Sequence, residues 1–279
     1  MKPTAIYSIP EMRKVVRSSK GTIGFVPTMG FLHDGHLSLV KEARKKADVV
    51  VVSIFVNPTQ FSPNEDLQSY PRDAEKDLAA LARVGADYVF FPTNEMMYPA
   101  DYKTWVTVDE LTSVLCGKTR TIHFRGVTTV VTKLMHIIDP DFMFMGEKDF
   151  QQLKVLQQMG RDLNFRTEII GCPLIREKDG LAMSSRNVYL SADEREKALC
   201  LNRSLRLAQQ LFAEGSEETK NIVSQMQDLI EAAGGKIDYI EIVDPETLQS
   251  IPVAHADSKV MLAVYMGKTR LIDNMCISK

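Results

Sequence analysis

Long apolar runs alternate with amphipathic segments over the first two-thirds of the chain. The apolar runs have the length of strands and lie at residues 22–27, 49–55, 87–91, 141–145 and 166–170. Helical patterns fall between them, at about 36–46, 73–84, 127–138 and 149–163. The run VVVVSIF at 49–55 does not alternate apolar with polar positions, which is typical of a strand buried on both faces of a parallel sheet. The pattern therefore predicts a doubly wound, Rossmann-like α/β fold with a parallel sheet.

The pattern changes after about residue 175. Two helical stretches, at roughly 191–213 and 216–233, precede short apolar runs near 237–243, 259–266 and 269–273. Helices followed by strands of this kind indicate a second, smaller α+β domain at the C-terminal end. We therefore divide the chain into a Rossmann-like domain, residues 1–175, and a small C-terminal domain, residues 176–279.

Composition excludes several classes of partner. The 279 residues carry a formal net charge of -2, which gives no basic footprint for nucleic acid. No apolar run approaches the roughly 18 residues of a membrane span, and the N-terminal residues lack the apolar segment of a secretory signal. The four cysteines form no C-x-x-C pair, so neither a zinc knuckle nor a redox pair is indicated. We expect no nucleic acid and no membrane as partners, and free thiols in a reducing cytoplasm.

The stretch PTMGFLHDGH, residues 27–36, follows the first apolar run and precedes a helical pattern. Ligands of open α/β sheets bind where strands end and helices begin, and a helix N-terminus there favours phosphate. Gly30 and Gly35 allow the backbone to turn tightly and to approach a ligand. His33 and His36 lie three residues apart, on one face of the helix start, where both can donate hydrogen bonds to one phosphate.

Two alternatives to phosphate binding stay open for the histidines. They can be turn residues whose rings bond to backbone groups, or a metal pair. The H-x-x-H spacing lacks the i, i+4 separation and central Glu of H-E-x-x-H, so the metal interpretation is the weakest of the three. The stretch matches neither G-x-G-x-x-G nor G-x-x-x-x-G-K-[ST], so neither a dinucleotide fingerprint nor a P-loop is present.

Polar side chains follow two other apolar runs. SIFVNPTQF places Asn57 and Gln60 after a buried strand, where amides suit a small hydroxy acid with a carboxylate. The alternative is a plain Asn-Pro turn. GEKDFQQ places Lys148 where it can neutralise phosphate, Asp149 where it can cap a helix or bind a ribose hydroxyl, and Gln152 on the same helix face. The alternative is a helix cap beside a solvated lysine.

Two further polar segments carry candidate chemistry. AMSSRN, residues 182–187, offers two hydroxyls and an arginine fork for triphosphate oxygens, or a serine-rich turn. NEDLQSYPRD, residues 64–73, is predicted as a polar loop. Asp73 and Asp77 are considered as neighbours of magnesium, but surface carboxylates of a helix are the preferred interpretation. No protein ligand of a metal is assigned.

These strings together resemble one known family. HDGH stands in the place of the HIGH tetrapeptide of the nucleotidyltransferase superfamily, and the whole stretch 27–36 is similar to the version found in pantothenate synthetases, the pantoate–β-alanine ligases. The segment 182–187 resembles the KMSKS-like loop of the superfamily, with Arg186 where a lysine often stands. The resemblance covers nearly the whole chain and includes the order and spacing of the four motifs.

The resemblance implies an ATP-dependent carbon–nitrogen ligase. Such an enzyme converts ATP and pantoate to pantoyl adenylate and pyrophosphate, and β-alanine then displaces AMP to give pantothenate. The N-terminal domain would bind nucleotide and pantoate, the C-terminal domain would cover the site, and the 64–73 loop would form a mobile wall. Mg²⁺, a homodimer and a cytoplasmic location are also implied. Rival functions are another HIGH-type nucleotidyltransferase and a nucleotide-binding module without catalysis.

The resemblance also assigns roles to particular residues. The residues expected to act in catalysis are His36, His33, Lys148 and Arg186. Those expected to bind ATP are Met29, Gly30, His33, Gly35, His36, Gly146, Glu147, Lys148, Asp149, Ile175, Met183, Ser184, Ser185 and Arg186. Those expected to bind pantoate or β-alanine are Gln60, Gln152, Asn57 and Tyr70.

One departure from the family pattern affects the string TIHFRGV at 121–127. Pro-Gly commonly precedes the His-Phe-Arg-Gly of this string in the family, whereas this chain has Thr121 and Ile122. The geometry of that turn, and any role of His123 in binding, are therefore left open.

Overall fold

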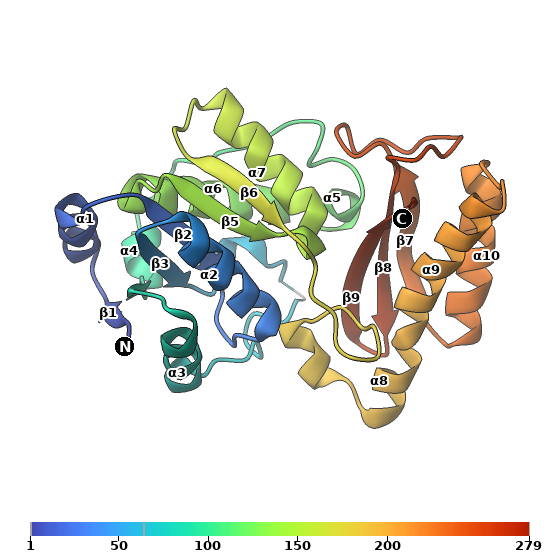
Figure 1. Cartoon of the computed structure of the whole chain (residues 1–279), viewed down its shortest axis with the longest axis horizontal. Coiled ribbons are helices and arrows are strands. Elements are labelled where there is room, and N and C mark those ends of the chain that lie inside the picture. The colour runs from blue at the N-terminus through green and yellow to red at the C-terminus, as the bar shows by residue number, and fades with distance from the viewer. Residues whose placement is uncertain (1, 64, 279) are drawn as a thin grey trace. The chain divides into compact units, whose positions relative to one another are not determined.

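The computed structural model describes residues 2–63 and 65–278 of the chain. They fold into two compact units, each built from several stretches of sequence (Figure 1). The first unit comprises Met1–Ser113, Gly117–Glu147 and Gln152–Pro173. The second unit comprises Val114–Cys116, Lys148–Gln151 and Leu174–Lys279. The division into domains at residue 175 stays a prediction from the sequence.

A parallel sheet forms the centre of the first unit. Within the described part of the chain it has six strands, in the order β1-β4-β3-β2-β5-β6. The strands are β1 (Thr4–Ile6), β2 (Ile23–Thr28), β3 (Val49–Ile54), β4 (Tyr88–Phe90), β5 (Phe142–Gly146) and β6 (Glu168–Cys172). Every strand pair in this sheet is parallel. The predicted doubly wound parallel sheet is confirmed.

Burial explains the continuous apolar run of β3. Val50, Val51 and Val52 are each 0% exposed, so successive side chains are covered on both faces of the sheet. Phe25 of β2 lies opposite Val51 of β3 and Met143 of β5, which places β2 at the middle of the sheet.

Helices cover both faces of this sheet. α2 (Asp34–Lys46) and α3 (Ala74–Val84) share one apolar cluster with β2, β3 and β4, and so lie on one face. α6 (His123–Ile138) and α7 (Phe150–Asp162) lie on the other face (Figure 1). The Thr132 hydroxyl of α6 donates to Met159 Sδ of α7 at 3.2 Å. α4 (Asn94–Met97) and α5 (Cys116–Thr119) are single turns in the connections.

The sequence pattern missed the first two elements. β1 is only three residues long, too short for periodicity to show. α1 (Ile9–Ser18) has a short N-terminal signature: the Ser8 side chain accepts from Glu11 N–H, and a proline stands in the first turn. That signature is typical of a helix start.

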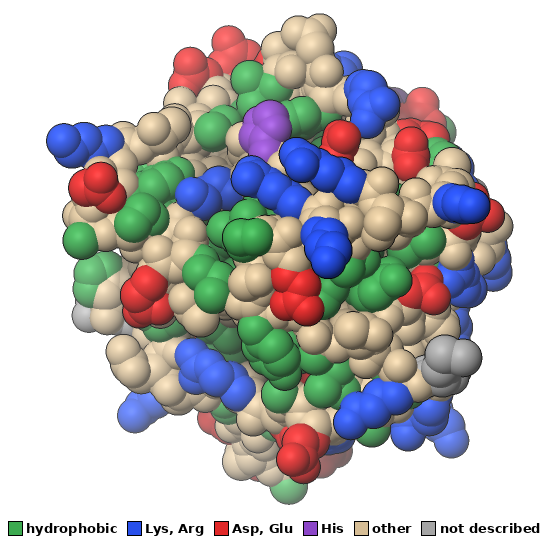
Figure 2. Space-filling model, turned by 90° about the vertical axis from the view of Figure 1, so that its left-hand side faces the viewer, with side chains coloured by type: hydrophobic (Ala, Val, Ile, Leu, Met, Phe, Trp, Pro, Cys, Tyr) green, Lys and Arg blue, Asp and Glu red, His purple; other side chains and the backbone are tan. Residues whose placement is uncertain are grey.

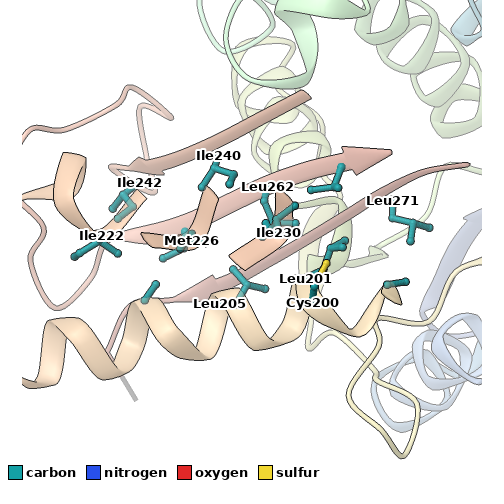
Figure 3. Close-up of a cluster of buried hydrophobic side chains, with 14 of the residues drawn as sticks. Cys200, Leu201, Leu205, Ile222, Met226, Ile230, Ile240, Ile242, Leu262 and Leu271 are labelled. Carbon is teal, nitrogen blue, oxygen red and sulfur yellow. The ribbon is translucent and has the colours of Figure 1, made fainter. Parts of the chain in front are cut away.

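The second unit is an α+β layer, as predicted. β7 (Lys236–Val243), β8 (Lys259–Met266) and β9 (Thr269–Cys276) form an antiparallel sheet. α9 (Leu199–Ala213) and α10 (Thr219–Ala232) pack on it through a buried apolar cluster that includes Leu205, Met226 and Leu262 (Figure 3).

The helical stretch predicted at roughly 191–213 is helical, but it is divided in two. The structure has two helices there, α8 (Ala192–Lys197) and α9, which meet at Ala198. Ala198 caps the end of the first and the start of the second, and it is fully buried. Its backbone stays in the αR region, so the break changes no hydrophobic period and the sequence pattern carries no signal of it.

One face of the structure carries side chains of both charges and of apolar type (Figure 2). Figure 2 shows one face on which Lys and Arg side chains lie near a histidine, with acidic and apolar side chains among them. The face is therefore mixed in charge. Among the described residues, no helix combines the length and the apolar character needed to span a bilayer.

Candidate active site

The carboxyl ends of parallel strands bring three candidate segments to one edge of the first unit. β2 lies between β3 and β5, and the chain leaves β2 toward β3 on one side while β5 continues toward β6 on the other. This is the topological switch point at which doubly wound sheets bind ligands. Residues 29–36 follow β2, residues 57–60 follow β3, and Gly146 ends β5.

The turn between β2 and α2 has an unusual backbone. Gly30 and Phe31 both have positive φ, at 84° and 50°. Glycine adopts this region readily, but for phenylalanine it is strained. The N–H of Phe31 donates to Asp77 Oδ2 at 2.8 Å, and the N–H of Leu32 donates to Asp77 Oδ1 at 2.7 Å. One carboxylate thus holds the strained turn that leads to His33.

The interpretation of Asp77 as a surface carboxylate was wrong. Its side chain is buried, with 1% exposure, and both of its oxygens accept backbone hydrogen bonds. Burial raises the pKa of Asp77, and the N–H groups of Leu32 and Phe31 oppose that rise. Asp73 does behave as a helix-cap residue, because its Oδ1 accepts from Lys76 N–H at 3.0 Å.

The two histidines cap the N-terminus of α2. Gly35 N–H donates to His33 Nδ1 at 3.1 Å, and His33 N–H points to His36 Nδ1 at 3.4 Å. The ring centroids are 4.0 Å apart, so the rings share one side of the helix start. A backbone N–H can only donate, so each Nδ1 acts as the acceptor and the neutral ring carries its hydrogen on Nε2.

This arrangement combines two of the interpretations drawn from the sequence. The rings do bond to backbone groups, but through Nδ1. Each Nε2–H is then a donor held in a fixed orientation at a helix N-terminus, which suits an anionic oxygen. The first turn of α2 contributes N–H groups of its own there, including that of Gly35 beside His33.

Asn57 and Gln60 form a buried amide pair after β3. Asn57 is 1% exposed and Gln60 is 9% exposed. Asn57 Nδ2 donates to Gln60 Oε1 at 3.0 Å and to the carbonyl oxygen of Gly126 at 3.1 Å. Gln60 Nε2 lies 3.2 Å from Met29 Sδ, which connects this pair to the β2–α2 turn.

The backbone of Gln60 is held from α6. His123 is buried, and its Nδ1 lies 2.9 Å from the carbonyl oxygen of Gln60. Gly126 allows this close packing, because a Cβ there would lie 2.4 Å from the carbonyl oxygen of Thr59. The effect of Thr121 and Ile122 is now visible: Ile122 precedes α6 with φ -97° and ψ -13°, which needs no glycine.

Gln152 and Tyr70 also belong to the first unit. Gln152 is half-buried on α7, and its side-chain amide makes no hydrogen bond with the residues the structure describes. Its neighbour Gln151 belongs to the second unit, where it accepts from Cys116 N–H and donates to the Val114 carbonyl. Tyr70 is 5% exposed and meets Phe61 edge to face, at 6.0 Å between centroids.

The loop at 64–73 was predicted to be polar and without helix or strand. Its described part has turns and bends at 65–69 and an irregular backbone at 70–73. Glu65 pairs with Arg120, with 2.7 Å from Arg120 Nε to Glu65 Oε1. Arg72 donates to the carbonyl oxygens of Tyr70 and Leu67. Asn64 lies outside the described residues.

The second unit holds the other predicted ATP residues. Lys148 Nζ lies 4.0 Å from Asp149 Oδ2, and the Lys148 carbonyl accepts from Asn274 Nδ2 of β9 at 3.0 Å. Ile175 and Met183 face each other across a tight hairpin, with Met183 N–H donating to the Ile175 carbonyl at 3.0 Å.

The serine pair begins a short helix in that unit. Ser184 caps a 3-10 helix, Ser185–Tyr189, and its Oγ accepts from Arg186 N–H at 3.2 Å. Ser185 is buried. Serine hydroxyls and an arginine at a helix start favour an anionic group.

A buried ion pair anchors the hairpin to β9. Arg176 Nη1 and Nη2 lie 2.6 Å and 2.9 Å from the two carboxylate oxygens of Asp273. Burial raises the pKa of Asp273, and the adjacent Arg176 guanidinium opposes that rise. Asp273 is next to Asn274, so one stretch of β9 holds both the Lys148 segment and the hairpin.

The described residues form no cluster of metal ligands. Within residues 2–63 and 65–278, no group of three or more His, Cys, Asp or Glu side chains is placed to hold a metal ion. Asp77, which was considered as a neighbour of magnesium, has both oxygens bonded to the backbone.

Sequence reasoning missed two residues that shape the site, Tyr98 and Gly126, and misinterpreted a third, Asp77. The Tyr98 hydroxyl donates to Asn57 Oδ1 at 2.8 Å. Asp77 did carry a signal, because with Ala80 and Leu81 it falls on the buried stripe of α3 at helical spacing. Tyr98 carried none, because it lies in an irregular connection 41 residues from its partner.

Comparisons with known proteins agree on one family. The family model for pantoate-beta-alanine ligase matches residues 4–276. A pantothenate synthetase of Thermotoga petrophila is 54% identical over 275 residues, which cover 96% of this chain and 98% of that protein. One of Pseudothermotoga lettingae is 50% identical, with coverage of 98% and 99%.

Solved structures agree as well. The crystal structure of pantothenate synthetase from Thermus thermophilus is 41% identical, with a TM-score of 0.95 and coverage of 99% of this chain and 100% of that one. The pantoate-beta-alanine ligase from Francisella tularensis, solved as a complex with beta-gamma ATP and beta-alanine, is 36% identical, with a TM-score of 0.84 and coverage of 99% and 98%.

Proposed function

The chain belongs to the pantoate–β-alanine ligase family, and from that premise we infer how its residues carry out the reaction. It is an ATP-dependent ligase that joins pantoate to β-alanine. A carboxylate is a poor acylating agent because its oxide leaving group is too basic. Adenylation replaces that group with AMP, which leaves far more readily.

Two bond exchanges complete the reaction. A pantoate carboxylate oxygen attacks the α-phosphorus of ATP, and the bond from that phosphorus to pyrophosphate breaks. The amine of β-alanine then attacks the acyl carbon of pantoyl adenylate, loses a proton, and AMP departs. Because the enzyme forms no covalent bond of its own, its residues act by positioning and by stabilising charge.

The capped histidine pair is the observation that carries this assignment of roles. His33 and His36 bond to the backbone through Nδ1. This arrangement would let their Nε2–H groups donate to a phosphate at the start of α2. We assign them to the negative charge that develops on the phosphates as pyrophosphate leaves. Met29, Gly30 and Gly35 would provide the turn that lets the nucleotide approach this backbone.

The remaining phosphate contacts are assigned to cationic and hydroxyl groups. Lys148, Ser184, Ser185 and Arg186 would bind the phosphate chain through charge-assisted hydrogen bonds. Asp149 would bind a ribose hydroxyl. The backbone at Gly146 and Glu147 and the side chains of Ile175 and Met183 would line the nucleotide. An open space beside Gly146, where a Cβ would meet nothing within 4 Å, supports this use of the strand end.

Gln60 and Gln152 are assigned to pantoate, and Gln60 also to β-alanine. The side-chain amide of Gln152 makes no hydrogen bond with the described residues, so it would be available to a substrate. Asn57 is assigned to the support of Gln60, because its own amide is already bonded on both sides. Tyr70 would face the substrate from the 64–73 segment.

Mg²⁺ would enter with ATP. The chain offers no preformed cage among its described residues, so phosphate oxygens and water are the ligands that fit. When bound, the ion neutralises part of the triphosphate charge. The cations of the chain, Lys148 and Arg186, would share that task.

We also propose a cytoplasmic location and a homodimer. ATP as a substrate supports the first, as do the buried thiols of Cys172 and Cys200, which form no disulfide. The family resemblance supports the second, and light scattering at several protein concentrations tests it. A mass that stays at that of one chain, 31.4 kDa, would contradict the dimer.

Product analysis tests the activity itself. With ATP, pantoate and β-alanine present, we expect AMP, pyrophosphate and pantothenate in equal amounts, identified by mass spectrometry. Omission of either acid should stop steady-state turnover. Sustained release of AMP without pantoate would favour a different nucleotidyltransferase reaction, and binding of ATP without any turnover would favour the non-catalytic module.

A further inference from the structure

The backbone fixes the orientation of the Asn57 side-chain amide. Thr59 N–H points to Asn57 Oδ1 at 3.4 Å, and a backbone N–H can only donate. On the other side, Asn57 Nδ2 lies 3.1 Å from the carbonyl oxygen of Gly126, which can only accept. If the amide were reversed, the Asn57 NH₂ group would face the Thr59 N–H, donor against donor, and the Asn57 oxygen would face the Gly126 carbonyl, acceptor against acceptor. Only one orientation is therefore compatible with this site.

The orientation of Asn57 determines that of Gln60. The amide hydrogen of Asn57 that does not bond to Gly126 points to Gln60 at 3.0 Å, so the Gln60 atom there must be the acceptor, Oε1. Gln60 Nε2 then lies at the opposite end, beside Met29 Sδ at 3.2 Å. A thioether is a weak acceptor and engages one hydrogen at most. Gln60 therefore retains donor capacity for a ligand.

Tyr98 completes this chain of hydrogen bonds. Its hydroxyl donates to Asn57 Oδ1 at 2.8 Å, and the Thr59 hydroxyl lies 2.9 Å from the same oxygen and 3.1 Å from the Tyr98 hydroxyl. Burial raises the pKa of Tyr98 to about 12, so the hydroxyl remains a donor throughout the working range of pH. The ring is held by an edge contact with Tyr102 and a stacked contact with Trp105.

We propose that Tyr98 is a positioning residue that acts through Asn57, so that Gln60 presents its Nε2–H donors to the hydroxy acid. The substrate atom opposite Gln60 is then an oxygen acceptor, which a carboxylate or a hydroxyl oxygen provides. This inference rests on the proposed assignment of Gln60 to pantoate. It adds the direction of the hydrogen bond and the residues that set it.

Removal of the Tyr98 hydroxyl tests the positioning role. Tyr98→Phe should raise KM for pantoate by about 3- to 10-fold, the effect of one hydrogen bond of ordinary strength, with little change in kcat or in KM for ATP. Tyr102→Phe is the matched control, because the Tyr102 hydroxyl makes no hydrogen bond among the described residues. A general loss of structure would instead lower kcat and affect both substrates.

A double-mutant cycle shows whether Tyr98 acts through Gln60. In a Gln60→Ala background, Tyr98→Phe should leave KM for pantoate unchanged, because the amide it orients is absent. If Gln60→Ala alone leaves that KM unchanged, the proposed assignment of Gln60 fails. If Gln60→Ala raises it but Tyr98→Phe does nothing, or adds its full effect in both backgrounds, this inference is overturned.

Gln60→Glu tests the direction of the hydrogen bond separately and does not depend on folding of the Tyr98 variant. Glutamate keeps an oxygen for Asn57 but replaces the amide donors with a second acceptor. We expect KM for pantoate to rise at least as far as in Gln60→Ala, while thermal unfolding shows an intact fold. A wild-type KM for Gln60→Glu would show that the substrate does not need these donors, and would overturn the inference.

Discussion

Asp77 accepts a hydrogen bond from the backbone N–H of Leu32, with 2.7 Å between Leu32 N and Asp77 Oδ1. The two residues are 45 positions apart, on α3 and on the turn that leads into α2. The second oxygen of Asp77 accepts from Phe31, whose φ of 50° is strained. The position of the capping histidines therefore depends on a carboxylate outside the motif that contains them.

Asp77→Ala should damage both stability and adenylation. The buried N–H of Leu32 and the partly buried N–H of Phe31 lose their acceptor. A buried unsatisfied group costs about 1–3 kcal/mol of unfolding free energy, and a partly buried one costs less. The turn before His33 loses its restraint, so pyrophosphate release should slow by at least about tenfold. Urea unfolding and a single-turnover assay measure the two effects.

Asp73→Ala is the control for that experiment. Asp73 caps the same helix, with its Oδ1 3.0 Å from Lys76 N, but does not contact the β2–α2 turn. It should cost about 1 kcal/mol of stability and leave adenylation intact. Equal kinetic losses in the two variants would show that α3 as a whole, and not the Asp77 carboxylate, supports the turn.

The pH dependence of stability provides a separate test of Asp77. Its pKa is raised by burial, so folding favours the protonated carboxyl. The resulting stabilisation is present below the unfolded pKa of about 3.9 and is lost as pH rises through the higher folded pKa. The unfolding free energy of the wild type should therefore fall relative to that of Asp77→Asn as pH rises through this window. If the unfolding free energy of the wild type relative to that of Asp77→Asn stays constant or increases as pH rises, the pKa of Asp77 is not raised.

His36→Ala should abolish adenylate formation while leaving the fold intact. Loss of one donor to a developing charge typically costs a factor of ~10²–10³ in rate. The burst of pyrophosphate on mixing enzyme, ATP and pantoate is the measurement. His136→Ala is the control, because His136 lies on α6, where its ring meets Phe165 at 5.5 Å between centroids. An undiminished burst in His36→Ala would remove His36 from the chemistry.

Arg176→Ala should destabilise the second unit strongly. Asp273 is 2% exposed, and its carboxylate loses both of its bonds to the guanidinium. Loss of one partner of a buried pair costs about 3–5 kcal/mol. Arg195→Ala breaks pairs with the more exposed Glu177 and Asp179, and should cost about 1 kcal/mol or less. Chemical denaturation measures the unfolding free energy of both variants. If both lose a similar amount, the buried pair of Arg176 with Asp273 stabilises the fold no more than the exposed pairs of Arg195.

The parts of the fold that the sequence predicted are those with strong periodicity. The run at 49–55 indicated a strand covered on both faces, and Val50, Val51 and Val52 are fully buried. β1, with three residues, is too short to show a period. The break at Ala198 leaves the apolar spacing of α8 and α9 unchanged, so tertiary packing and not local pattern sets it.

The candidate site was predictable where the residues of a motif form hydrogen bonds with one another. His33 and His36 bond to backbone groups within their own turn, so a short stretch of sequence specifies the arrangement. Tyr98 acts on Asn57 from an irregular segment far along the chain, and no local pattern marks such a pair. The direction of the Gln60 amide follows from the Gly126 carbonyl, which only the packing of α6 brings near.

The most direct measurement is exchange of labelled pyrophosphate into ATP. If pantoate displaces pyrophosphate in a reversible first step, exchange should require pantoate, proceed without β-alanine, and be absent with other carboxylic acids. It should disappear in His36→Ala and persist in Tyr102→Phe. Exchange that requires β-alanine, or that proceeds without pantoate, would contradict a pantoyl adenylate formed at the capped histidine pair.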